Sequence, residues 1–131
     1  MKKLRAALIG CGRIGSEFDK KIPTKEAFSH AGAYRLCRDT DLVSAADPDP
    51  KKREAFAKKW GISEGYGRYQ DMLKKESIDI VSVATPPKTH WPVIREACRY
   101  PLKAIYCENL SPNPLRTPKR SQRFVKIKIF S

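Results

Sequence analysis

The chain has 131 residues, of which 40% are apolar and 31% charged, so it is long enough for one compact globular domain. No apolar run approaches the ~18 residues that a membrane span needs, and the basic start is followed by too short an apolar stretch for a signal peptide. The four cysteines form no CxxC pair and there are two histidines, which excludes a zinc pattern and favours free thiols in a reducing cytoplasm.

The net charge of +13 raises the question of a nucleic-acid partner, but its distribution argues against one. Residues 1–108 hold 21 basic and 14 acidic residues, whereas residues 109–131 hold six basic residues and no acidic one. The body is therefore moderately basic. No recognition helix or aromatic stacking platform accompanies the charge, so nucleic-acid binding is the least favoured hypothesis.

Short apolar runs of the kind found in buried parallel strands alternate with helical patterns along the chain. Strands are predicted over Leu4–Gly10, Leu42–Asp47, Ile78–Thr85 and Lys103–Cys107, with a minimal further strand in "GYGRY". Helices are predicted from Arg13 to about Lys20, within "TKEAFSHAGAYRLC", and over "DPKKREAFAKKWG", "YQDMLKKE" and "THWPVIREACRY". This alternation predicts an α/β fold, a Rossmann-type doubly wound parallel sheet of about five strands.

The stretch "GCGRIG" places Gly10, Gly12 and Gly15 in a G-x-G-x-x-G arrangement between a strand and a helix. In such a motif the first glycine makes a tight turn, the second lets the backbone approach a pyrophosphate, and the third lets the helix pack close to the strand. The start of the helix, including Arg13 and Ile14, then presents backbone N–H groups to the phosphates.

Asp47 ends the second predicted strand, where a carboxylate can accept hydrogen bonds from the adenosine ribose. It lies 32 residues after Gly15 rather than about 20, which the segment "IPTKEAFSHAGAY" explains if it is an insertion. The alternative is a turn or helix-capping acid within "DPDP". An acid here repels a 2′-phosphate, so NAD is the expected cofactor, while the nearby cations of residues 51–53 leave NADP open.

The glycine motif together with "LVSAADPDPKKREAFAKKWGI", "DIVSVATPPKTHWPVIREAC" and "AIYCENLS" resembles the N-terminal half of the Gfo/Idh/MocA oxidoreductases, which act on sugars and polyols. The resemblance covers about residues 3–112. It implies that Thr85, Pro86 and Pro87 line the dinucleotide groove and that His90 lies near the nicotinamide. The alternative for His90 is a solvent-exposed residue at a helix start, and for His30 a surface or capping role is favoured over substrate contact.

The sequence departs from the family pattern after the predicted strand Lys103–Cys107. Relatives typically carry Glu-Lys-Pro there, whereas this chain keeps Glu108 but has Asn109 in place of the lysine that could assist proton movement. No catalytic residue is therefore expected to be intact, with His90 the remaining candidate. The predicted cofactor-binding residues are Gly10, Gly12, Arg13, Ile14, Gly15, Asp47, Thr85, Pro86, Pro87, His90 and Glu108.

We expect residues 1–108 to form the dinucleotide-binding domain and residues 109–131 to form a basic, proline-containing tail, either disordered or added to a sheet edge. The family's C-terminal α+β domain, which would supply the sugar or polyol site, is not recognisable after Glu108. A reading-frame change at the lysine codon, giving a truncated chain, would explain this break. The alternatives are a natural short protein with an adapted tail and a truncated chain with a passive one.

These observations favour an NAD(P)-binding domain of a sugar or polyol dehydrogenase, incomplete as a catalyst, with no membrane association. The alternative is a non-enzymatic nucleotide-binding or interaction module that uses the basic tail. Self-association through an exposed sheet face or the tail is a further expectation.

Overall fold

The computed structural model describes residues 2–17, 19–63, 65–108 and 124–128 of the chain. Asn109 and most of the predicted tail thus lie outside the described residues, and the predicted division at residue 108 stays a prediction.

A mixed sheet with four parallel strands forms the centre of the fold. Its strands are β1 (Leu4–Ile9), β2 (Thr40–Ala46), β3 (Ile80–Val83), β4 (Ala104–Glu108) and β5 (Phe124–Lys128), in the order β2-β1-β3-β4-β5. The first four are parallel, and β5 pairs antiparallel with β4 at the edge. The order reverses direction between β1 and β3, which confirms the doubly wound α/β fold. The predicted strand in "GYGRY" is reduced to one bridge, between Ala46 and Tyr66.

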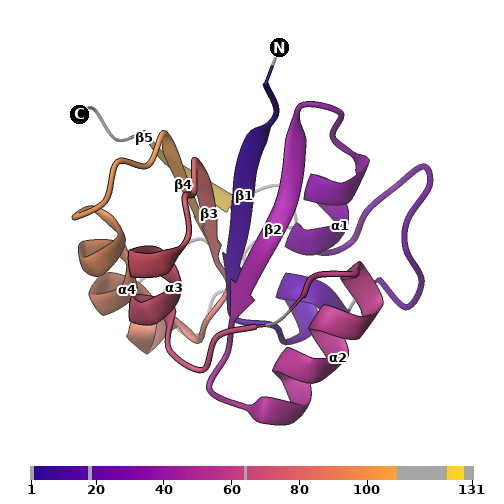
Figure 1. Ribbon diagram of the computed structural model, residues 1–131, viewed down its shortest axis with the longest axis horizontal. Coiled ribbons are helices and arrows are strands. Elements are labelled where there is room, and N and C mark those ends of the chain that lie inside the picture. Colours follow the sequence, from indigo (N-terminus) through magenta and orange to yellow (C-terminus); the bar gives the residue numbers. More distant parts are fainter. Residues whose placement is uncertain (1, 18, 64, 109–123, 129–131) are drawn as a thin grey trace, which may run out of the picture.

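Helices cover both faces of the sheet, as Figure 1 shows: α1 and α2 lie on one side, and α3 and α4 on the other. Their bounds are η1 (Arg13–Glu17), α1 (His30–Leu36), α2 (Pro50–Trp60), α3 (Tyr69–Lys75), η2 (Pro87–Thr89) and α4 (His90–Ala97). The first predicted helix is shorter than expected, because η1 is a single π-helical segment that ends at Glu17. Within the described ranges, no helix is long and apolar enough to cross a membrane.

The side chains of successive β1 residues pack into two separate hydrophobic cores, one on each face of the sheet. Ala7 and Ile9 join the cluster under α3 and α4, whereas Ala6 and Leu8 join the cluster under α1 and α2. Strand β3 divides in the same way, with Val81 and Val83 on the first face. Because side chains of a strand point alternately to opposite faces, a strand buried on both sides must be apolar at almost every position. This explains the nearly continuous apolar runs in the sequence.

Helix α2 begins and ends where its capping residues predict. The Asp49 side chain accepts a hydrogen bond from the Lys51 N–H at 2.9 Å, and Pro50 occupies the first helical position. Gly61 ends the helix in the left-handed region, with φ of 70°. The apolar face of the helix brings Phe56 and Trp60 into the core. The sequence-based prediction of this helix is confirmed.

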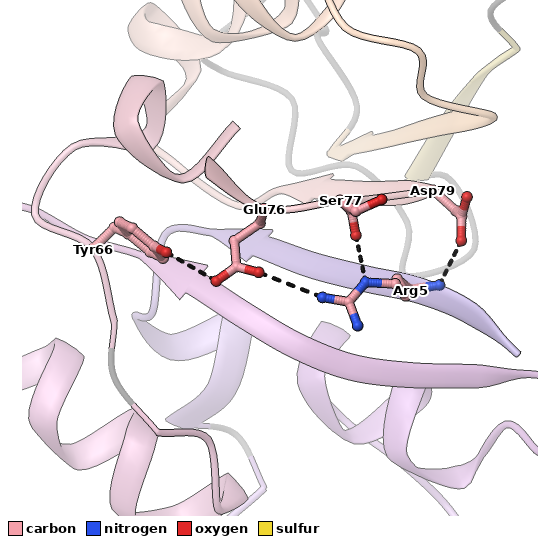
Figure 2. Close-up of polar contacts among 5 residues, drawn as sticks. All are labelled: Arg5, Tyr66, Glu76, Ser77 and Asp79. Carbon is pink, nitrogen blue, oxygen red and sulfur yellow. Dashed lines mark hydrogen bonds and ion pairs between the residues drawn. The ribbon is translucent and has the colours of Figure 1, made fainter. Parts of the chain in front are cut away.

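A polar network ties the amino ends of β1 and β3 together (Figure 2). The Arg5 backbone N–H donates to Asp79 Oδ2 at 2.8 Å, and its Nε donates to the Ser77 carbonyl at 2.5 Å. Glu76 accepts from the Arg5 guanidinium at 3.4 Å and from the Tyr66 hydroxyl at 2.8 Å. The arginine is partly exposed, so the ion pair itself contributes little, and the hydrogen bonds to backbone groups fix the register of the two strands.

The segment between η1 and α1 is anchored by a buried carboxylate. Asp19 accepts hydrogen bonds from the backbone N–H groups of Phe28 and Ser29 and from the Ser29 hydroxyl. The Ser29 Oγ in turn accepts from the Gly32 N–H and caps α1. His30 follows the cap and is buried, at 5% exposed. The favoured surface or capping role for His30 is therefore wrong, because Ser29 makes the cap and the imidazole lies inside.

Burial lowers the pKa of His30 from 6.5 to about 4, which predicts a loss of stability in mild acid. Below pH 6.5 the unfolded chain binds a proton at His30 that the folded chain does not accept until about pH 4. Stability should therefore fall by about 2 kcal/mol between pH 7 and pH 5 from this group alone. Urea unfolding of the wild type and of His30→Leu at both pH values measures this loss. An equal decrease in the two proteins would contradict the assignment.

Candidate functional site

The carboxyl ends of β1, β2 and β3 meet at one edge of the sheet. The Gly10 N–H donates to the Ala46 carbonyl at 2.8 Å, and the Ala84 N–H donates to the Ile9 carbonyl at 2.8 Å. These bonds join the residues that directly follow β1 and β3 to the neighbouring strand ends. Since β1 and β3 flank the point where the strand order reverses, this edge is where an open α/β sheet places a ligand.

The three glycines of the motif have different structural reasons to be glycine. Gly10 has φ of +99°, and a Cβ at this residue would lie 2.7 Å from the Ala84 carbonyl oxygen. A Cβ on Gly15 would collide with the Gly10 carbonyl, so η1 packs directly against the end of β1. A Cβ added to Gly12 would meet no backbone atom of another segment. Among the described residues other than its chain neighbours, the one group within 4 Å of that Cβ would be the Lys52 ammonium, at 3.8 Å.

The backbone of Gly12 is oriented by η1. Its carbonyl accepts from the Ser16 N–H at 2.9 Å and from the Glu17 N–H at 3.0 Å. Because the peptide unit is planar and trans, the Arg13 N–H of the same unit points away from these donors, toward the start of the helix. Arg13 and Ile14 both lie within η1. The first N–H groups of a helix have no intrahelical acceptor, which makes this end suited to an anion.

Asp47 bridges the glycine loop and the start of α2. Its Oδ2 accepts from the Cys11 N–H at 2.8 Å, and its Oδ1 accepts from the Asp49 N–H at 2.9 Å. The residue is buried. Each carboxylate oxygen keeps further acceptor capacity, so the same group can hold the loop and still accept from a hydroxyl. The structure shows the turn contact directly, and ribose binding stays a prediction.

The cations after Asp47 occupy different positions. The Arg53 guanidinium donates to the Asp47 carbonyl at 2.9 Å and to the Pro48 carbonyl at 3.2 Å, so it braces the turn. Lys52 is exposed and directs its ammonium over Gly12. The sequence indicated a cluster of cations here but gave no means of telling which one faces the loop. Which cation faces the loop depends on the directions in which the Lys52 and Arg53 side chains leave the first turn of α2.

Cys11 lies inside the glycine loop and stays a neutral thiol. Burial raises its pKa from 9.0 to about 12, and the Asp47 carboxylate adds to the effect. Arg53 and Lys52 act in the opposite direction but do not offset burial. The loop therefore carries no thiolate that would repel a bound phosphate.

The end of β3 brings Thr85 and His90 together. Pro86 and Thr89 form the turn between them, and His90 starts α4 fully buried. The solvent-exposed alternative for His90 is therefore wrong. Its Nε2 lies 2.6 Å from the Thr85 carbonyl. Since a carbonyl accepts only, Nε2 carries a hydrogen, and in the tautomer that has its hydrogen on Nε2 alone, Nδ1 is an acceptor.

Two buried polar atoms in this turn have no hydrogen-bond partner among the described residues, namely Thr85 Oγ1 and His90 Nδ1. Such atoms are rare, because an unsatisfied buried polar group is costly, and they accompany sites where a ligand or water completes the structure. Pro87 belongs to η2 in the same turn, and Glu108 ends β4.

Comparison with known proteins agrees with this geometry. The family described as oxidoreductase family, NAD-binding Rossmann fold (Gfo/Idh/MocA) matches residues 4–114. A trans-1,2-dihydrobenzene-1,2-diol dehydrogenase from Mus musculus is 26% identical over 105 residues, covering 80% of this chain and 28% of the relative.

Solved structures agree with the family match. A myo-inositol 2-dehydrogenase from Lactobacillus plantarum superposes with a TM-score of 0.66 at 27% identity, covering 82% of this chain and 28% of that one. The WlbA dehydrogenase from Chromobacterium violaceum, solved with NADH and UDP-GlcNAcA, gives a TM-score of 0.61 at 29% identity, covering 76% and 25%.

The chain thus spans about a quarter of the length of these relatives. The region that the family model matches contains the glycine loop, the acid after β2 and the turn after β3. The chain belongs to the Gfo/Idh/MocA oxidoreductase family, of which it carries the NAD-binding Rossmann domain.

Proposed function

We propose that the carboxyl edge of the sheet binds NAD(H), with the pyrophosphate over Gly12, the adenosine ribose at Asp47 and the nicotinamide end toward Thr85 and His90. The bound nicotinamide would supply the hydride acceptor for oxidation of a secondary alcohol, and sugars or polyols are the proposed substrate class because of the relatives' names. Pro86, Pro87 and Glu108 are proposed to line the groove. Three observations support this placement: the space at Gly12, the carboxylate of Asp47 and the polar atoms after β3.

The observation that carries the proposal is the open space at Gly12. Gly10 and Gly15 must be glycine because the protein's own backbone approaches them. Gly12 has no such internal reason, since its nearest outside neighbour is the flexible Lys52 side chain at 3.8 Å. Its missing side chain is explained if another molecule approaches its backbone, as a pyrophosphate does in this motif.

Replacing Gly12 by valine should therefore separate binding from folding. We expect Gly12→Val to keep a melting temperature close to that of the wild type, because its Cβ lies clear of the protein's backbone, and to lose at least tenfold in NADH affinity because the side chain occupies the phosphate position. Gly15→Val is the matched control and should unfold the domain. Thermal melts and fluorescence titration with NADH measure both effects. Undiminished NADH binding by Gly12→Val would overturn the proposed site.

The two unpartnered atoms after β3 suit the other end of the cofactor. Thr85 Oγ1 can donate or accept, and His90 Nδ1 can accept from an N–H. A nicotinamide carboxamide carries both an acceptor oxygen and donor N–H groups. Both atoms are buried, so the side chains of Thr85 and His90 must shift for a carboxamide to reach them. On this proposal the nicotinamide half lies at the β3 end and the adenosine half at Asp47.

Asp47 and Lys52 together set the expected cofactor preference. The buried carboxylate should repel a 2′-phosphate and favour NADH over NADPH, while the nearby ammonium weakens this repulsion. We expect Lys52→Ala to lower the affinity for NADPH, and to lower it about twofold to fivefold more than the affinity for NADH. The difference is small because an exposed charge contributes little to binding. Lys51→Ala, which removes the same charge from the neighbouring exposed residue, is the control. Tighter binding of NADPH than NADH by the wild type would contradict this assignment.

We also propose that cofactor binding here is not accompanied by dehydrogenase turnover. The family resemblance implies a Glu-Lys-Pro motif in which Asn109 takes the place of the lysine, and an amide cannot act as an acid or base. With NAD⁺ and myo-inositol, the chain should bind cofactor yet form no NADH, as followed by nicotinamide absorbance. Sustained NADH formation by the purified chain would show that Asn109 or another group replaces the lysine.

A further inference from the structure

Ser16 connects the glycine loop to the far end of α2. It lies in η1 and is buried, at 3% exposed. Its Oγ accepts a hydrogen bond from Trp60 Nε1 at 2.8 Å, and its carbonyl accepts from the Lys59 ammonium at 3.2 Å. Both partners come from the last turn of α2, more than 40 residues away in the sequence.

Through its backbone, Ser16 also holds the peptide unit that faces the phosphate site. The Ser16 N–H is one of two donors to the Gly12 carbonyl. Together with the bond from the Glu17 N–H, it sets the plane of the Gly12–Arg13 peptide, and therefore the direction of the Arg13 N–H. A shift of Ser16 would tilt this N–H relative to an anion at the start of η1.

The Trp60 indole is itself fixed on several sides. It is 1% exposed, and its ring packs against Phe56 at 6.3 Å between centroids. The Lys59 ammonium and the Arg35 guanidinium lie 5.1 Å and 5.7 Å from the ring centroid, and Arg35 also donates to the Trp60 carbonyl. These contacts hold the indole with its N–H directed to Ser16.

We propose that Trp60 and Ser16 are positioning residues for the pyrophosphate: the indole N–H holds the Ser16 side chain, and Ser16 holds the Gly12–Arg13 peptide in the orientation that binds phosphate. This inference rests on the proposed function and adds two residues to it. Neither residue touches the cofactor. Lys59 and Arg35 contribute by fixing the indole.

A positioning role and a purely structural role predict different changes in ligand affinity. The clamp, meaning the Trp60–Ser16 hydrogen bond, orients a phosphate donor and leaves the adenosine contact at Asp47 unchanged. Loss of the clamp should lower the affinity for ADP-ribose and NADH but not for adenosine. A general loosening of the fold would weaken all three ligands.

The experiment compares Trp60→Phe, Ser16→Ala and the double variant with the wild type. Trp60→Phe removes the N–H donor and keeps an aromatic ring, and Ser16→Ala removes the acceptor with a small change in volume. Trp91→Phe is the matched control, because Trp91 is 60% exposed on α4. Affinities for NADH and ADP-ribose are measured by calorimetry and for adenosine by NMR titration, at a temperature where thermal melts show every variant folded.

We expect each single variant to lose about threefold to tenfold in affinity for NADH and ADP-ribose, the range of one lost hydrogen bond, with adenosine unchanged. The double variant should be no weaker than the weaker single one, because both remove the same bond. Unchanged NADH affinity, additive losses, or an equal loss for adenosine would overturn the clamp while leaving the cofactor site intact. If the wild type itself bound no NADH, the proposed function would fail, and the clamp with it.

Discussion

The hydrogen bond from the Cys11 N–H to the Asp47 carboxylate is the contact on which the site depends. It joins the loop after β1 to the turn after β2, and the second carboxylate oxygen joins the same turn to the Asp49 N–H. Strand pairing alone aligns the strands but does not fix the loops beyond them. A buried carboxylate with two backbone donors does so, because leaving either donor unsatisfied would be costly.

The parallel sheet explains why these loops lie together at all. Strands β1, β2 and β3 run in the same direction, so their carboxyl ends share one edge, which is where an open α/β sheet places a ligand. The amino edge has a different character. There Arg5 and Asp79 satisfy backbone groups across β1 and β3, and these contacts serve the register of the strands. The amino edge thus serves the register of the strands, and the proposed ligand site lies at the opposite edge.

Local sequence patterns predicted much of this structure, but they did not predict the contacts between residues far apart in the sequence. Asp49, Pro50 and Gly61 fixed the bounds of α2 because capping depends on immediate neighbours. The glycine loop and the doubly wound fold followed from spacing and alternation. The burial of His30 and His90 depends on how α1 and α4 pack, which a single-sequence pattern does not encode, and the Trp60–Ser16 contact likewise joins residues far apart in the chain.

The three glycines of the motif differ in whether the fold itself requires them. At Gly10 and Gly15 the nearest atoms to an added Cβ belong to the protein's own backbone, so these positions would be glycine even in a protein that bound nothing. Gly12 is free of that constraint, and the neutral Cys11 thiol beside it adds no negative charge. The backbone of Gly12 lies near the Lys52 ammonium and next to the first N–H groups of η1, and no other described segment approaches its Cβ position. These are features that favour an approaching phosphate and contribute nothing evident to folding.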